Sequence, residues 1–138
     1  MKEPELQAVS EMAFVVGEAD LASTLSTDPE DAFPGVFATS RMVGFMELAA
    51  ARLLRPLLEP GQLSVGVTIE TSHTAATALG ATVRARARYL GREGKLYVFE
   101  VAALDEAGEV GRGTHKRAII SLDRLLAGAA RRRGQAPG

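Results

Sequence analysis

One long apolar segment, with the length and composition of a buried helix, limits the folds open to this sequence. From Met42 to Leu58 nearly every residue is apolar or small, apart from two arginines and a single acid, Glu47. Thr39 and Ser40 lie just before the segment and are suitable N-cap residues. Pro56 is expected to kink or end the helix, because proline lacks the amide proton that the helix needs.

The segments after the helix have the alternating pattern of β-strands. One of them, 81–90, places Arg84, Arg86 and Arg88 on one face and small or apolar residues on the other. The expected strands are 12–16 before the helix and 63–74, 81–90, 95–104 and 110–122 after it. Residues 20–36 carry two prolines and no clear hydrophobic periodicity, which predicts a long loop. A short helix is expected over 123–130.

This order of elements predicts an α+β protein in which a five-stranded antiparallel sheet wraps around one long central helix, the hot-dog fold. The 138 residues are expected to form a single domain, 1–138, with 1–11 and 131–138 as loose ends. A sheet of this kind has an unpaired edge and a partly apolar surface. A homodimer or a higher oligomer would cover both.

Composition excludes several function classes. The net charge of −1 gives no reason to expect nucleic acid or a membrane surface as a partner. The chain has no cysteine and only two histidines, so thiolate chemistry is excluded and neither a metal site nor a cofactor is expected. Metal, phosphate-loop and dinucleotide motifs are absent. The N-terminus lacks an apolar signal run, and we expect a cytoplasmic protein.

Three residues have the chemistry of a catalytic site, and each also has a simpler interpretation. A helical wheel places Glu47 among small and apolar residues, where an unpaired carboxylate is costly to bury, although it could instead face solvent. His73 ends an apolar strand face and is either a packed histidine or a proton carrier. Thr39 is either an N-cap or a group beside the free amides of the helix start. His115 lies in a basic stretch and has a weaker case.

Four stretches resemble one family of enzymes. They are "FPGVFAT" (33–39), "MVGFMELAAARLLRPLLEPG" (42–61), "SHTA" (72–75) and "GEVGRGTHKRAII" (108–120). Their order and spacing are similar to those of the fluoroacetyl-CoA thioesterase group of hot-dog-fold enzymes. The resemblance runs from about Phe33 to Leu122.

The resemblance implies a homodimeric acyl-CoA thioesterase that hydrolyses a short-chain acyl-CoA to a carboxylate and free coenzyme A. It implies three catalytic residues, a threonine before the helix, a glutamate within it and a histidine at a strand end, and three residues in contact with substrate. The catalytic residues fall on Thr39, Glu47 and His73, and the substrate-binding residues on Phe33, Gly66 and Arg117.

Three positions differ from the pattern of that group. Glu30 stands where a second phenylalanine is expected, Leu48 where an aromatic is expected, and Arg41 where a small residue is expected. These differences concern selectivity for a fluorinated acyl group and leave the hydrolytic residues in place. Two alternatives remain: a non-catalytic acyl-CoA-binding protein, and an enoyl-CoA hydratase, whose characteristic motif is absent.

Overall fold

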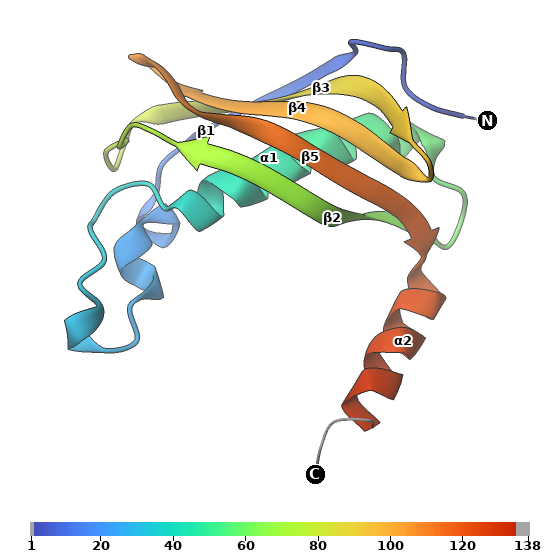
Figure 1. The fold of residues 1–138 in the computed structure, drawn as a ribbon. Helices are drawn as coiled ribbons and strands as arrows, with labels where there is room; N and C mark the ends of the chain where they lie inside the picture. Colours follow the sequence, from blue (N-terminus) through green and yellow to red (C-terminus); the bar gives the residue numbers. More distant parts are fainter. Residues whose placement is uncertain (1, 135–138) are drawn as a thin grey trace.

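The computed structural model describes residues 2–134. A long helix follows the first strand and a connecting segment, and four strands and a second helix complete the chain (Figure 1). The elements are β1 (Val9–Val15), α1 (Thr39–Leu54), β2 (Gln62–His73), β3 (Thr82–Glu93), β4 (Leu96–Asp105), β5 (Gly108–Ser121) and α2 (Leu122–Gly134). No helix within residues 2–134 is long and apolar enough to cross a membrane.

The five strands form one antiparallel sheet in the order β1-β3-β4-β5-β2, and α1 lies against its concave face. This confirms the predicted α+β hot-dog architecture. The first two strands in sequence, β1 and β2, are therefore the two edges of the sheet. Helix α2 continues from the end of β5 and extends away from the sheet (Figure 1).

Several boundaries differ from the predicted ones. Strand β1 begins at Val9 instead of Met12, so residues 9–11 are paired with β3 and are not part of a loose end. Helix α1 ends at Leu54, and the chain passes into a short 3-10 turn over Arg55–Leu57, as expected beside Pro56. Helix α2 reaches Gly134, beyond the predicted 123–130, and residues 135–138 of the expected loose end lie outside the described residues.

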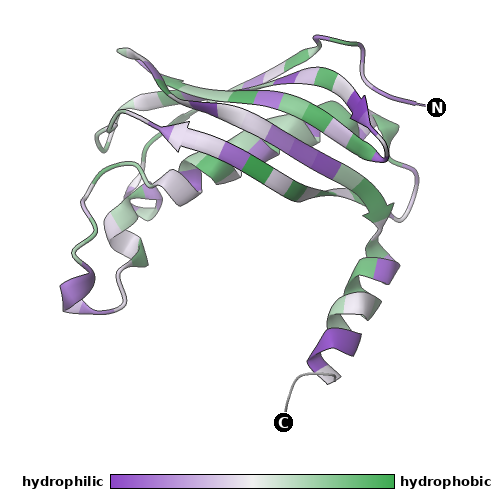
Figure 2. Cartoon of the chain, viewed as in Figure 1, coloured by the Kyte–Doolittle hydropathy of each residue, from purple (hydrophilic) through white to green (hydrophobic). Residues whose placement is uncertain are grey.

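The sheet has an apolar concave face and a charged convex face, and β3 shows both (Figure 2). Its inward residues are all buried: Val83, Ala85, Ala87 and Tyr89. Its outward arginines pair with acids on neighbouring strands, Arg84 and Arg86 with Glu11 and Arg88 with Glu100. The arginine row is thus a solvated, ion-paired face of the sheet.

The rotation of α1 differs from the one inferred from the helical wheel. Five side chains that share one face are fully buried against the sheet: Met42, Met46, Ala49, Ala50 and Leu54. Glu47 therefore lies at the margin of the buried face and not at the centre of an apolar one. Its side chain retains 40% exposure.

The predicted loop before α1 has more local structure than its sequence indicated. Residues 17–38, which we call the cover segment, contain three 3-10 turns at Glu18–Asp20, Ala22–Leu25 and Pro29–Asp31. Isolated bridges pair Leu21 with Phe37 and Val36 with Ala78. These contacts hold the cover segment beside the N-terminal end of α1 and the loop after β2.

Candidate active site

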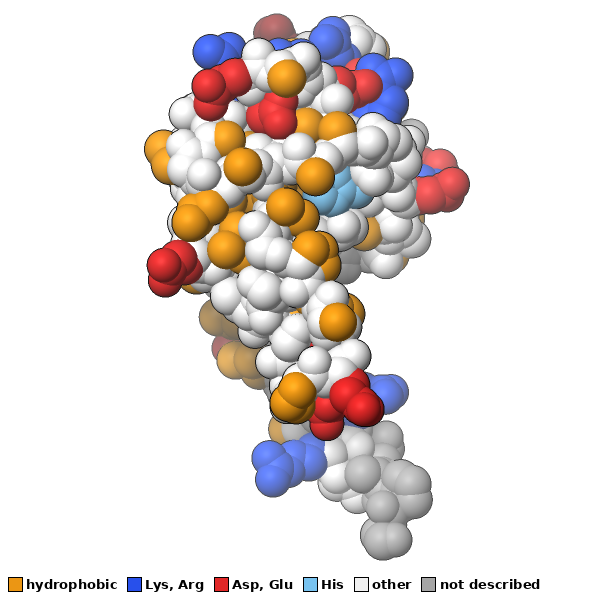
Figure 3. Space-filling model, turned by 90° about the vertical axis from the view of Figure 1, so that its left-hand side faces the viewer, with side chains coloured by type: hydrophobic (Ala, Val, Ile, Leu, Met, Phe, Trp, Pro, Cys, Tyr) orange, Lys and Arg blue, Asp and Glu red, His pale blue; other side chains and the backbone are white. Residues whose placement is uncertain are grey.

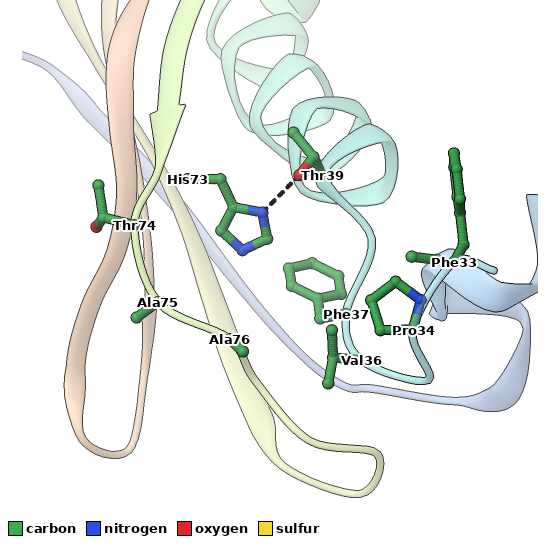
Figure 4. Close-up of a pocket in the computed structure, with 10 residues that line it drawn as sticks. Phe33, Pro34, Val36, Phe37, Thr39, His73, Thr74, Ala75 and Ala76 are labelled. Atoms are coloured by element: carbon green, nitrogen blue, oxygen red, sulfur yellow. Dashed lines mark hydrogen bonds between the residues drawn. The ribbon is translucent and has the colours of Figure 1, made fainter. Parts of the chain in front are cut away.

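The first residue of α1 contacts the last residue of β2. Thr39 Oγ1 lies 2.7 Å from His73 Nδ1, a hydrogen bond between residues that are far apart in sequence (Figure 4). Of the two interpretations of Thr39, the helix cap does not hold, because Ala38 is the N-cap residue and provides no side-chain cap. The hydroxyl of Thr39 is therefore available to the imidazole.

The other nitrogen of His73 is buried without a partner. Within the described residues, Nε2 is shielded from solvent and makes no hydrogen bond. The ring is held edge-on to Phe37, with 6.2 Å between the ring centroids, and Figure 4 shows Phe37 beneath it. An unpaired buried nitrogen is unfavourable in the free protein.

A cavity of about 440 Å³ opens beside this pair. Its described lining comes from the cover segment, the start of α1 and the end of β2, and apart from His73 it has no ionisable side chain: Ala22, Phe33, Pro34, Val36, Phe37, Thr39, His73, Thr74, Ala75 and Ala76. Phe33 is half exposed at this cavity. In Figure 3, which views this end of the molecule, a histidine lies beside a group of hydrophobic side chains.

Arg41 is directed to the cover segment and is not part of the described cavity lining. Its Nε and Nη2 each lie 2.8 Å from Oδ1 of Asp20, a largely buried acid whose Oδ2 accepts the amide of Gly17. Its guanidinium also lies over the ring of Phe45, 5.2 Å from the centroid. Arg41 thus fastens the cover segment to the helix that carries Thr39.

Glu47 forms a second polar group with β5 and β2. Its Oε2 accepts a hydrogen bond from Nη1 of Arg117 at 3.1 Å. Arg117 is nearly buried, and its Nε and Nη2 donate to the side chain and the carbonyl of Ser64. Burial lowers the pKa of Arg117, and the negative charge of Glu47 opposes this shift. The carboxylate is neither unpaired nor simply solvated.

Gly66 lies directly against this carboxylate. A Cβ at this position would overlap Oε2 of Glu47 and would approach Cε1 of His115 to 3.2 Å. The strand is irregular at this point, since the β2–β5 register shifts between Gly66 and Thr68. A glycine in a strand interior commonly marks a bulge or a close approach, and here it marks both.

His115, which sequence reasoning ranked below His73, belongs to the Glu47 group. The residue is 1% exposed, with Nδ1 at 2.7 Å from the carbonyl oxygen of Thr68 and Nε2 at 3.1 Å from Nη1 of Arg117. Burial lowers the pKa of His115 below its usual value, and the charge of Arg117 lowers it further, while Glu47 and the Thr68 carbonyl act in the opposite direction. The "GTHKR" spacing, which puts His115 and Arg117 on one strand face, was the signal available in the sequence.

The six predicted site residues therefore fall into two groups, each with one member on α1 and one on β2. Thr39, His73 and Phe33 of the cover segment border the cavity. Glu47 lies further along α1, where it meets Gly66 of β2 and Arg117 of β5. Eight residues separate Thr39 from Glu47, about 12 Å along the helix axis. Within the described part of the chain, no cluster of three or more His, Asp or Glu side chains could hold a metal ion.

Solved structures of thioesterases share this architecture. A variant of the fluoroacetyl-CoA-specific thioesterase FlK matches with a TM-score of 0.89 and 38% identity over 96% of this chain and 99% of the other. A variant of FlK in complex with fluoroacetate and CoA matches with a TM-score of 0.83 and 40% identity over 88% of this chain and 98% of that one. A thioesterase superfamily member from Thermus thermophilus matches with a TM-score of 0.86 and 26% identity over 98% and 97% of the two chains. The fold and these relatives define the class, hot-dog-fold proteins of the thioesterase superfamily.

The sequence comparisons narrow this class to one family. The family model described as fluoroacetyl-CoA-specific thioesterase matches residues 16–123. The fluoroacetyl-CoA thioesterase of Streptantibioticus cattleyicolor is 48% identical over 95 residues, which are 69% of this chain and 68% of that protein. The chain belongs to the fluoroacetyl-CoA-specific thioesterase family.

The lowered pKa of His115 predicts a pH-dependent stability. Below about pH 6.5 the unfolded chain protonates this histidine more readily than the folded chain does, so the free energy of unfolding falls as pH falls. The expected slope from this one group is at most about 1.4 kcal/mol per pH unit. Denaturant unfolding of the wild type and His115→Gln between pH 7.5 and 5 should give curves that converge toward low pH. Parallel curves would show that His115 titrates equally in both states.

Proposed function

We propose that this protein is an acyl-CoA thioesterase that hydrolyses the thioester of a short-chain acyl-CoA, with Thr39, Glu47 and His73 as catalytic residues. The observation that carries the proposal is the hydrogen bond between Thr39 and His73 at the mouth of an apolar cavity. Membership of a thioesterase family supports the same reaction. In this reaction water adds to the thioester carbonyl and coenzyme A leaves as the thiol.

The proposed chemistry divides between the two polar groups. The thioester lies between them, and Glu47 removes a proton from the attacking water or attacks the carbonyl itself. Thr39 and His73 are close enough for proton transfer, so the threonine either orients the attacking water or serves as the nucleophile. His73 delivers a proton to the departing sulfur. The free amides at the start of α1 and near Gly66 are suitable donors to the oxyanion.

The cavity lining supports an uncharged acyl group. No lysine or arginine is among its described residues, so a second carboxylate on the acyl chain would lose its water without gaining a partner. Phe33 and Phe37 instead offer apolar contact. Fluoroacetyl-CoA, which names the family, meets this requirement, and so do acetyl-, propionyl- and butyryl-CoA. Arg117, the third proposed substrate contact with Phe33 and Gly66, lies outside this lining.

We further propose that a homodimer in the cytoplasm is the working form, with residues 1–138 acting as one domain. Strand β2 is an edge of the sheet, and its neighbour α1 exposes Leu48 and part of Glu47 on the same side. A second copy paired along β2 would cover this edge and the Glu47 group together. The absence of cysteine fits a reducing compartment.

Loss of any proposed catalytic side chain should abolish most thioester hydrolysis. Glu47→Gln, His73→Ala and Thr39→Ala should each lower kcat by about 100-fold or more, because each removes a proton-transfer or nucleophilic group. Release of free thiol from acetyl-, propionyl- and fluoroacetyl-CoA measures the rate. Glu100→Gln, a change on the convex face, is the control and should retain full activity. Near wild-type turnover by both Glu47→Gln and His73→Ala would contradict the proposed site.

The apolar lining predicts discrimination by acyl charge. Butyryl-CoA should have a kcat/KM at least roughly tenfold above that of succinyl-CoA, whose acyl chain has the same length and ends in a carboxylate. An uncompensated desolvation cost of about 1.4 kcal/mol for that carboxylate is enough to give this ratio. The same thiol assay measures both substrates. Equal values would show that the acyl chain does not enter the cavity beside His73. Tight binding of all the CoA esters without release of thiol would favour a non-catalytic binding protein.

A further inference from the structure

His115 is buried at the centre of a polar chain that ends on Glu47. The ring contacts the Thr68 carbonyl on one side and the Arg117 guanidinium on the other, and the same Nη1 of Arg117 contacts the Glu47 carboxylate. The contacts come from three elements, since Thr68 lies on β2, Glu47 on α1, and His115 and Arg117 on β5. None of the reactions assigned above to Thr39, Glu47 or His73 uses His115.

The partners of His115 determine its tautomer. A carbonyl oxygen only accepts hydrogen bonds, so the bond to Thr68 requires a proton on Nδ1. A guanidinium only donates, so the bond from Arg117 requires a free lone pair on Nε2. Both contacts are satisfied only by the neutral imidazole with its proton on Nδ1. The bulge at Gly66–Thr68 lies where β2 presents that carbonyl to the ring.

The three nitrogens of the Arg117 guanidinium all make hydrogen bonds to other groups of the protein. Nε and Nη2 bond to Ser64 at 3.1 and 3.0 Å, and Nη1 is shared at 3.1 Å between His115 and Glu47. The side chain is only 7% exposed. A guanidinium held in this way has a fixed position, and that position determines where the Glu47 carboxylate lies.

We propose that His115 is a positioning residue for Glu47 and acts through Arg117. The neutral imidazole accepts an N–H of Arg117 and fixes the guanidinium, which in turn holds the carboxylate against Gly66. Arg117 is then a positioning residue too. The inference rests on the proposed function, since it takes Glu47 as the working carboxylate.

Protonation of His115 would break this arrangement, because the cation loses the lone pair that accepts from Arg117 and faces a second cation. The charged groups that face the ring are Arg117, on its own strand, and Glu47, from α1. The neighbouring strands contribute the Thr68 carbonyl and the apolar residues Ile69 and Phe99, its register partners on β2 and β4. Burial and Arg117 both favour the neutral form that positioning requires.

Three substitutions at His115 distinguish a role in positioning Glu47 from a role in packing alone. Glutamine can place an acceptor where Nε2 lies, asparagine reaches only toward Thr68, and phenylalanine fills the ring volume without either bond. His115→Gln should retain kcat within about threefold, whereas His115→Asn and His115→Phe should lower kcat by about 10–100-fold with little change in KM, because a carboxylate displaced by about 1 Å loses activity on that scale. The acid limb of the kcat/KM profile should also shift in the impaired variants.

The measurement is steady-state hydrolysis of one acyl-CoA by each folded variant, with the fold checked by circular dichroism. Equal kcat values for the glutamine, asparagine and phenylalanine variants, whether all high or all low, would overturn the proposal. So would a pH profile in the impaired variants identical to that of the wild type. If His115→Phe does not fold, the comparison of glutamine with asparagine decides the same question.

A combined variant distinguishes failure of this inference from failure of the proposed function. In a Glu47→Gln background, His115→Asn should have no further effect on kcat, because the carboxylate that it positions is already absent. A further 10-fold loss would show that His115 acts independently of Glu47 and would overturn the inference alone. Full activity of Glu47→Gln by itself would instead contradict the proposed function.

Discussion

The burial of α1 against the concave face of the sheet is the interaction on which the rest of the structure depends. Met42, Met46 and Leu54 are completely buried on this face, and each such side chain contributes about 1.5–3 kcal/mol relative to an exposed one. Their packing fixes the rotation of the helix and therefore the direction of its polar residues. Thr39 meets the end of β2, and Glu47 meets the middle of the same strand at the edge of the buried face.

The two polar groups along α1 have different physical environments, and the proposed chemistry uses this difference. Thr39 and His73 lie beside an apolar cavity and share a hydrogen bond, which suits a pair of groups that transfers a proton. Glu47 is instead held by a buried guanidinium whose own donors are engaged. In the proposed mechanism the first group receives the substrate, and the second presents a fixed negative charge to it.

Much of the fold followed from periodicity alone, since alternation in the strand segments and the apolar run of α1 leave few ways to bury both. The geometry of the site could not be predicted from periodicity, because it depends on contacts between residues that are distant in sequence. Local pattern left Thr39 as either a helix cap or a functional group, and the family resemblance favoured the second; its contact with His73, 34 residues away, is visible only in the structure. The partner of Glu47, Arg117, is 70 residues away. The case for His115 as a functional residue was weak in the sequence because its neighbours are basic, which suggests an exposed position, whereas the residue is buried.

The central claim is that Thr39 and Glu47, about 12 Å apart along one helix, serve a single hydrolytic reaction. The kcat values of Thr39→Ala, Glu47→Gln and the double variant, measured on one acyl-CoA, test this claim most directly. Residues that act as a unit show strongly non-additive losses. If the two residues act as a unit, the double variant should be no slower than the slower single variant, within about threefold. A double variant whose loss is the product of the two single losses would show that the two residues act independently and would contradict it.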